Sequence, residues 1–112
     1  MEPNGTGAPV VTDNAATSRY ELHVGDQLAG FVSYRLRGDV INLIHTEVDP
    51  KFQGAGFAGH LAKATLDDAR ARHLMVLPTC PYIRSWIRRH PDYADLVAER
   101  GTGKTQTEGG AG

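Results

Sequence analysis

At Gln53-Gly54-Ala55-Gly56-Phe57-Ala58-Gly59 the hydrophobic pattern of this sequence changes. Before this stretch apolar and polar residues alternate, which is typical of β-strands. After it, from Phe57 to His73, apolar residues recur every three or four positions, which predicts an amphipathic helix. Glycines let a backbone approach a ligand closely, and the first turn of a helix leaves N–H groups unpaired. The stretch therefore predicts a loop that binds phosphate or pyrophosphate; the alternative is a glycine-rich turn that only caps the helix.

Three strands are predicted before this loop, over residues 19–24, 28–36 and 40–48. Short turns separate them, so they form an antiparallel meander. After the predicted helix, the apolar run 74–77 predicts a buried strand parallel to the third. Pro81 then begins a second helix over about 81–90, and residues 92–97 are expected to form a short turn or helix. The order β-β-β-α-β-α predicts an α+β fold, in which an antiparallel meander leads into a parallel βαβ unit and a second helix.

The predicted folded domain covers residues 19–97 of the 112-residue chain. Residues 1–18 and 98–112 are rich in small and polar residues without an apolar period, which predicts two disordered tails. The strand over 19–24 is then expected at an exposed edge of the sheet, which would suit a monomer or a weak homodimer.

Charge and composition exclude several classes of protein. Twelve Lys and Arg against thirteen Asp and Glu give a formal net charge of −1, so neither nucleic acid nor an anionic membrane is an expected partner. The sequence contains no long apolar run and no secretory signal, which predicts a cytoplasmic protein. Its histidines and single cysteine show no ligand spacing, so no metal is expected.

The glycines of the loop also satisfy a dinucleotide-binding pattern. Gly54, Gly56 and Gly59 fit G-x-G-x-x-G, but five residues separate them from the end of the third predicted strand. The strand that follows the helix also lacks the acidic residue that binds ribose in dinucleotide-binding folds. We therefore reject a nicotinamide or flavin dinucleotide as the ligand.

Read as Q-x-x-G-x-A, the same loop (Gln53, Gly56, Ala58) resembles motif A of the GNAT N-acetyltransferases. Thr79-Cys80-Pro81-Tyr82-Ile83, then Trp86, and then His90-Pro91-Asp92-Tyr93 are similar to the small stand-alone GNAT-like subfamily. The resemblance covers about residues 19–97. It implies a minimal GNAT-like fold that moves an acetyl group from acetyl-coenzyme A (acetyl-CoA) to an amine of a protein or a small molecule.

The resemblance also implies which residues bind the coenzyme. The pyrophosphate would be held by the backbone N–H groups of Gln53, Gly54, Ala55, Gly56, Phe57 and Ala58. The main chain of Glu47 and Val48 would pair with the pantetheine arm between the third and fourth strands. Lys51 and the arginines Arg84, Arg88 and Arg89 could meet the 3′-phosphate; the alternative for the arginines is a solvated helix face.

Two residues are candidates for the chemistry. His45 is expected on the face of the third strand that Ile41 and Leu43 share, and Cys80 ends the fourth strand. The resemblance implies His45 as general base and Cys80 as acyl carrier or proton donor. A cysteine at a helix N-terminus beside a histidine could act as a thiolate nucleophile, although both residues could also be structural.

Tyr82 is expected in the core with Trp86; a second reading makes its hydroxyl the proton donor to the leaving thiolate.

The main alternative to an enzyme is a module that binds CoA or acetyl-CoA with little or no turnover. It arises because the chain lacks the helices and strands that form the acceptor side of larger GNAT enzymes. A structural domain without a ligand would require the glycine loop to be a coincidence.

Overall fold

The computed structural model describes residues 8–98. Five strands form one sheet in the order in which they occur in the chain: β1 (Val10–Asn14), β2 (Arg19–Val24), β3 (Gln27–Arg37), β4 (Val40–Val48) and β5 (Met75–Pro78). The first four are antiparallel, and β5 is parallel to β4. Helix α1 (Phe57–Ala71) connects β4 to β5, and α2 (Pro81–Arg89) follows β5. Short 3-10 helices span Pro50–Phe52 and Pro91–Leu96.

The structure confirms the predicted α+β fold. The antiparallel meander, the parallel βαβ unit and the second helix occur in the predicted order, and their bounds differ from the predicted ones by at most two residues. The turns form as predicted because Gly25 and Gly38 adopt φ values of 62° and 59°, which glycine reaches without strain. Pro81 occupies the first turn of α2, where its missing N–H leaves no helical hydrogen bond unmade.

The prediction of a disordered tail over residues 1–18 is wrong for β1. This strand pairs with β2 from Val10 opposite His23 to Asn14 opposite Arg19, so β2 is not the edge of the sheet. The sequence Val10-Val11-Thr12 contains β-branched residues but is too short to show a period. Residues 1–7 and 99–112, which make up most of the two predicted tails, lie outside the described residues.

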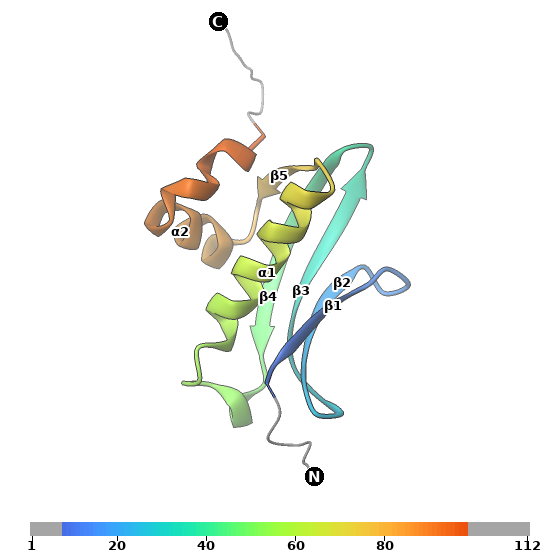
Figure 1. The fold of residues 1–112 in the computed structure, drawn as a ribbon, viewed down its shortest axis with the longest axis vertical. Helices are drawn as coiled ribbons and strands as arrows, with labels where there is room; N and C mark the ends of the chain where they lie inside the picture. Colours follow the sequence, from blue (N-terminus) through green and yellow to red (C-terminus); the bar gives the residue numbers. More distant parts are fainter. Residues whose placement is uncertain (1–7, 99–112) are drawn as a thin grey trace, which may run out of the picture.

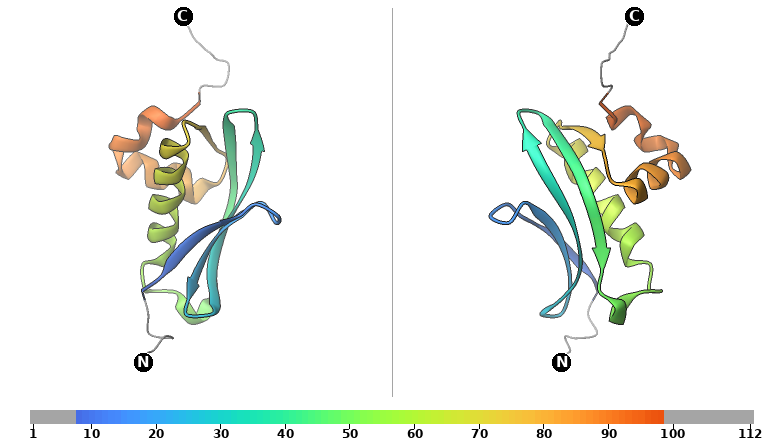
Figure 2. Two further views of the ribbon diagram at one scale, coloured as in Figure 1. Left: turned by 45° about the vertical axis from the view of Figure 1, so that its right-hand side comes forward. Right: turned by 180° about the vertical axis from the view of Figure 1, so that it is seen from behind.

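Both helices pack on one face of the sheet, which we call the inner face (Figure 1). Side chains that alternate along the strands are fully buried there against α1, because successive residues of a strand point to opposite faces. The sheet contributes Leu22, Val32, Ile41 and Leu43, and α1 contributes Leu61, Ala62 and Leu66. Seen from behind, β3 and β4 lie in front of α1, and no helix of residues 8–98 covers this outer face (Figure 2).

A β-bulge interrupts β4. Ser33 of β3 pairs with His45, but the next residue, Tyr34, pairs with Leu43, so Ile44 is left without a partner. One extra residue in a strand reverses the alternation of its side chains beyond that point. The side chains of β4 that face the inner face are therefore odd-numbered before the bulge and even-numbered beyond it.

Strands β4 and β5 pair over only four residues. The parallel ladder runs from Val40 opposite Met75 to Leu43 opposite Pro78, and the N–H of Cys80 adds one bond to the carbonyl of Leu43 at 2.8 Å. The chain then turns into α2. Residues 44–48 of β4 consequently have no neighbouring strand of the described chain on the β5 side, and we call this part of β4 the open edge.

Candidate active site

The glycine loop between β4 and α1 adopts a backbone conformation that needs glycine. Gly54 and Gly56 have φ values of 89° and 80°, and a Cβ placed on either would meet no atom within 4 Å. Space is therefore available at both positions, but a side chain would be strained by the left-handed backbone. Gly56 is the N-cap of α1 and makes no side-chain capping bond.

The backbone N–H groups of this loop from Gly54 onward have no partner among the described residues. The hydrogen bonds found among residues 8–98 include none donated by the backbone of residues 54–59. Unpaired N–H groups at a helix N-terminus, together with the positive end of the helix dipole, favour a bound anion. Phosphate binding by this loop stays a prediction, for which these N–H groups are available.

A cavity of about 340 Å³ connects this loop to the open edge of β4 and to α2. Its lining includes most of the residues predicted to bind the coenzyme, and it adds Phe52, Gly59 and Tyr82: the full set is Val48, Phe52, Gln53, Gly54, Gly56, Phe57, Ala58, Gly59 and Tyr82. Tyr82 is partly buried, and its hydroxyl lies 3.7 Å from the point that a Cβ on Gly59 would occupy. Its hydroxyl therefore faces the first turn of α1.

Ala55, Glu47 and Arg84 were also predicted to bind the coenzyme, but they do not line this cavity. The guanidinium of Arg84 donates to the carbonyls of Thr79 and Pro78, at 3.0 and 3.4 Å. Arg84 therefore stabilises the end of β5 and the start of α2. The structure does not place it beside the glycine loop.

The main chain of Glu47 is turned toward β3. A Cβ on Gly30 of β3 would lie 2.7 Å from the Glu47 carbonyl oxygen, which shows where that oxygen points. The carbonyl of Val48 points the other way and accepts a bond from Nε2 of Gln53 at 3.2 Å. Because the backbone N–H and C=O groups of successive residues point to opposite sides of a strand, those of Thr46 and Val48 point outward from the open edge, away from β3. The main chain of Thr46, and not that of Glu47, therefore lies with Val48 at the edge where the sequence predicted pairing with the pantetheine arm.

His45 does not share a face with Ile41 and Leu43, as the sequence predicted. Those two side chains are fully buried on the inner face, whereas the His45 side chain is 58% exposed on the outer face. The bulge at Ile44 causes the difference, since it reverses the alternation between them. Nε2 of His45 lies 3.2 Å from Oε1 of Glu47, and its ring meets that of Phe31 edge-on at 6.3 Å.

Cys80 lies on the other side of the sheet. It is the N-cap of α2 and is only 3% exposed, with its Sγ 3.4 Å from Oγ1 of Thr46. None of the contacts found among residues 8–98 joins the His45 imidazole to the Cys80 thiol, so the predicted adjacency of the two side chains is wrong. The sequence reasoning missed Thr46, whose position beside Cys80 depends on the bulge.

No group of three or more His, Cys, Asp or Glu side chains in residues 8–98 could hold a metal ion. Nor does this part of the chain contain a helix of the length and apolar character needed to cross a membrane.

The fold and the loop together define a class of protein. A strand, a glycine loop that opens the following helix, and two parallel strands that separate after four paired residues form the arrangement expected of the GNAT fold. The family model for the GCN5-related N-acetyltransferases matches residues 19–96, so this chain belongs to that family.

Relatives and a solved structure agree with this assignment. The chain is 40% identical to protein NATD1 of Homo sapiens over 52 residues, which are 46% of each protein. It is 36% identical to NATD1 of Danio rerio over 59 residues, 51% of this chain and 54% of that protein. The chain thus spans about half the length of the relatives it matches. The NMR structure of a GCN5-like protein from Staphylococcus aureus has the same fold, with a TM-score of 0.56, 18% identity and coverage of 88% and 90%.

Proposed function

We propose that this protein is an N-acetyltransferase that moves an acetyl group from acetyl-CoA to an amine. One observation carries the proposal: the unpaired N–H groups of the glycine loop and the open edge of β4 line a single cavity. An anion site beside an unpaired strand edge suits a ligand that joins a pyrophosphate to a chain of amides.

The described residues fit acetyl-CoA. The loop from Gly54 to Ala58 binds the pyrophosphate through its N–H groups, whereas the N–H of Gln53 donates to the Pro50 carbonyl. Cβ atoms at Gly54 and Gly56 would strain that cradle. Thr46 and Val48 offer backbone groups to the pantetheine amides, in the manner of an added strand. When bound, acetyl-CoA supplies a thioester whose carbonyl carbon the amine attacks.

His45 acts as the general base on the outer face. Its Nε2–H donates to the Glu47 carboxylate, which leaves Nδ1 with the lone pair that accepts the amine proton. Glu47 is a positioning residue, because it holds the imidazole in this tautomer without touching the amine. An amine can approach His45 directly from solvent, since no helix of the described chain covers this face.

Cys80 acts as the proton donor to the leaving sulfur on the inner side of the open edge. Its burial and its contact with the Thr46 hydroxyl favour a thiol that donates a proton over a cysteine that carries the acetyl group. In the balanced reaction the N–C bond forms and the thioester C–S bond breaks. His45 takes the amine proton, Cys80 protonates the leaving sulfur, and proton exchange with water restores both residues.

The test is calorimetric titration of the purified chain with acetyl-CoA, with NAD as a control ligand. Gly56→Ala and Gly38→Ala form a matched pair, because both glycines have positive φ and open space around them. Each substitution should destabilise the fold by about 1–2 kcal/mol. Only Gly56→Ala should weaken acetyl-CoA binding, by tenfold or more on an order-of-magnitude estimate, because it distorts the phosphate cradle.

Three results would contradict the proposal: no saturable heat with acetyl-CoA, equal heat with NAD, or equal loss of affinity in both variants. If acetyl-CoA binds but no amine is acetylated, the protein is a coenzyme-binding module and the proposed chemistry is wrong.

A further inference from the structure

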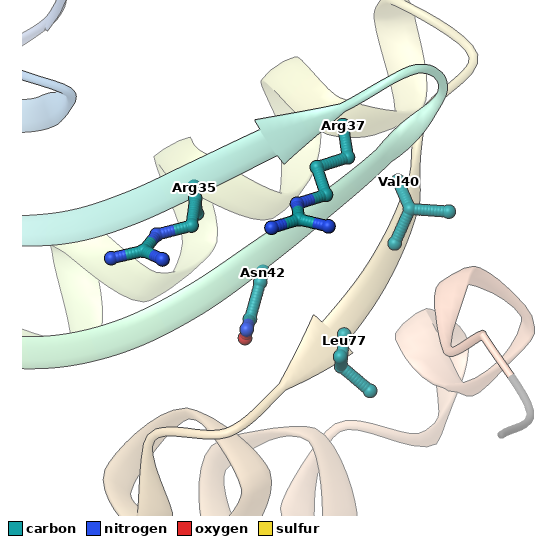
Figure 3. A pocket seen from close by; sticks show the side chains of 5 residues that line it. All are labelled: Arg35, Arg37, Val40, Asn42 and Leu77. Carbon is teal, nitrogen blue, oxygen red and sulfur yellow. The ribbon is translucent and has the colours of Figure 1, made fainter.

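A second cavity, of about 400 Å³, opens on the outer face. Side chains from three strands line it: Arg35 and Arg37 from β3, Val40 and Asn42 from β4, and Leu77 from β5 (Figure 3). Both guanidinium groups extend back along β3, away from the turn that joins β3 to β4 (Figure 3). Val40 and Leu77 provide apolar surface beside these two cations.

Among residues 8–98, the two arginines of this cavity have no acidic partner. Among residues 8–98, no carboxylate or carbonyl was found within bonding distance of the Arg35 or Arg37 guanidinium, and both residues are exposed. Other arginines of the described chain do have acidic partners: Arg19 binds Glu21, Arg70 binds Asp95, and Arg72 binds Asp13 and Asp68. The cavity is therefore a local cationic site in a chain whose net charge is −1.

The cavity and His45 share the outer face. Ser33 of β3 pairs with His45, and Arg35 pairs with Asn42 across the bulge. Arg35 and Arg37 therefore lie two and four residues beyond the level of His45 along β3. At the rise of an extended strand, the Cα atoms of Arg35 and Arg37 lie roughly 7 and 13 Å from the Cα of Ser33. Their guanidinium groups reach back toward the level of His45 (Figure 3).

We propose that the amine acceptor is an acidic peptide segment, with its amine at His45 and its carboxylates at Arg35 and Arg37. This inference rests on the proposed function, because it takes His45 as the place where the amine reacts. A guanidinium binds a carboxylate through two parallel N–H bonds, and Val40 and Leu77 cover the aliphatic part of a glutamate side chain.

The spacing selects a peptide over a free amino acid. The amine and the carboxylate of a free α-amino acid belong to one residue, whereas Arg35 and Arg37 are successive outward-facing positions of β3. An extended peptide with acidic residues two and four positions beyond its amine presents its carboxylates at the same spacing. The side-chain amide of Asn42 strengthens the site, because its oxygen accepts the Thr79 hydroxyl at 2.6 Å and no acceptor for its NH₂ was found among residues 8–98.

The test uses two peptides with a free N-terminus and a C-terminal fluorophore, Ala-Gly-Glu-Ala-Glu-Gly and Ala-Gly-Gln-Ala-Gln-Gly. Binding to the full chain is followed by fluorescence anisotropy without acetyl-CoA. The acidic peptide should bind about tenfold more tightly than the neutral one, and Arg35→Gln and Arg37→Gln should each remove about threefold to tenfold of that preference. Lys63→Gln is the control, because it also removes one positive charge, from the exposed side of α1. It should leave the preference unchanged.

Equal affinity for the two peptides overturns the inference, as does an equal effect of the Lys63 and arginine substitutions. Thermal unfolding of each variant shows that the fold is intact. Failure of the proposed function looks different: the chain then binds the acidic peptide with the expected arginine dependence but does not bind acetyl-CoA. A chain that acetylates both peptides equally well supports the proposed function and overturns the inference alone.

Discussion

Two tyrosines of the sheet donate hydrogen bonds to carboxylates, one of β1 and one of α1. The rings of Tyr20 and Tyr34 lie 5.4 Å apart, and the Tyr34 hydroxyl donates to Oδ1 of Asp13 at 2.6 Å. The Tyr20 hydroxyl donates to Asp68 of α1. Burial, and then the hydrogen bond to Asp13, raise the pKa of Tyr34 to about 12. Both effects favour the neutral hydroxyl in the folded protein.

Stability should therefore fall at alkaline pH, and Tyr34 should account for part of the fall. A raised pKa in the folded state means that the contribution is complete below the ordinary tyrosine pKa of 10.0 and is lost as the pH rises toward 12. Tyr34→Phe should lower the free energy of unfolding by about 1 kcal/mol at neutral pH. It should also reduce the slope of the decline above pH 10.

Urea unfolding of both proteins across this pH range measures the difference in slope. Tyr20 and the other titrating groups are present in both, so they cancel in the comparison. Parallel curves for the two proteins would show that Tyr34 titrates alike in the folded and unfolded chains.

Strand β4 shows what could and could not be predicted from the sequence. The glycine loop and α1 were predicted correctly because positive-φ glycines and a helical period are local properties. The bulge at Ile44 depends on how two strands pair, which the residues of β4 alone do not determine. The face of His45 was therefore predicted wrongly, and the position of Thr46 beside Cys80 was missed.

The position of His45 beyond the bulge leads to a kinetic prediction. His45→Asn should lower kcat by about 100-fold, which is the usual contribution of a general base, and should leave the affinity for acetyl-CoA unchanged. His73→Asn is the matched control, because His73 is exposed beyond the end of α1 and asparagine tolerates its φ of 58°.

Both variants would be assayed by release of the CoA thiol, with the two peptides as acceptors, and by calorimetry with acetyl-CoA. A His45→Asn variant that retains full kcat would show that another group removes the amine proton. A loss of coenzyme affinity would instead indicate that the substitution disturbs the open edge of β4.

Across the whole molecule, β1 is held in place by residues that lie far away in the sequence. Asp13 of β1 accepts the Tyr34 hydroxyl and also binds Nη1 of Arg72 at 3.1 Å, across 59 positions of the chain. Such contacts exist only after the sheet and α1 have come together. This explains why the local composition of residues 1–18 pointed to a tail.

Asp13→Ala should therefore destabilise the protein by about 1–3 kcal/mol, because it leaves the Tyr34 hydroxyl without its partner. Asp26→Ala is the control, since Asp26 lies in the exposed turn between β2 and β3 and no bond to its carboxylate was found among residues 8–98. Chemical denaturation followed by circular dichroism gives both values. Equal effects of the two substitutions would mean that β1 adds nothing to stability through this contact.

The strand order has a consequence for the time course of folding. Every neighbouring pair of strands is also consecutive in the chain, and the first three pairs close through short turns. Hairpins of this kind form in microseconds, whereas the β4–β5 pair must wait for α1 to cross between them. The meander should therefore assemble first, and the divergence of β4 and β5 beside Cys80 should form last. In a refolding experiment, acetyl-CoA binding would then appear as the final phase, after most of the strand signal has been regained.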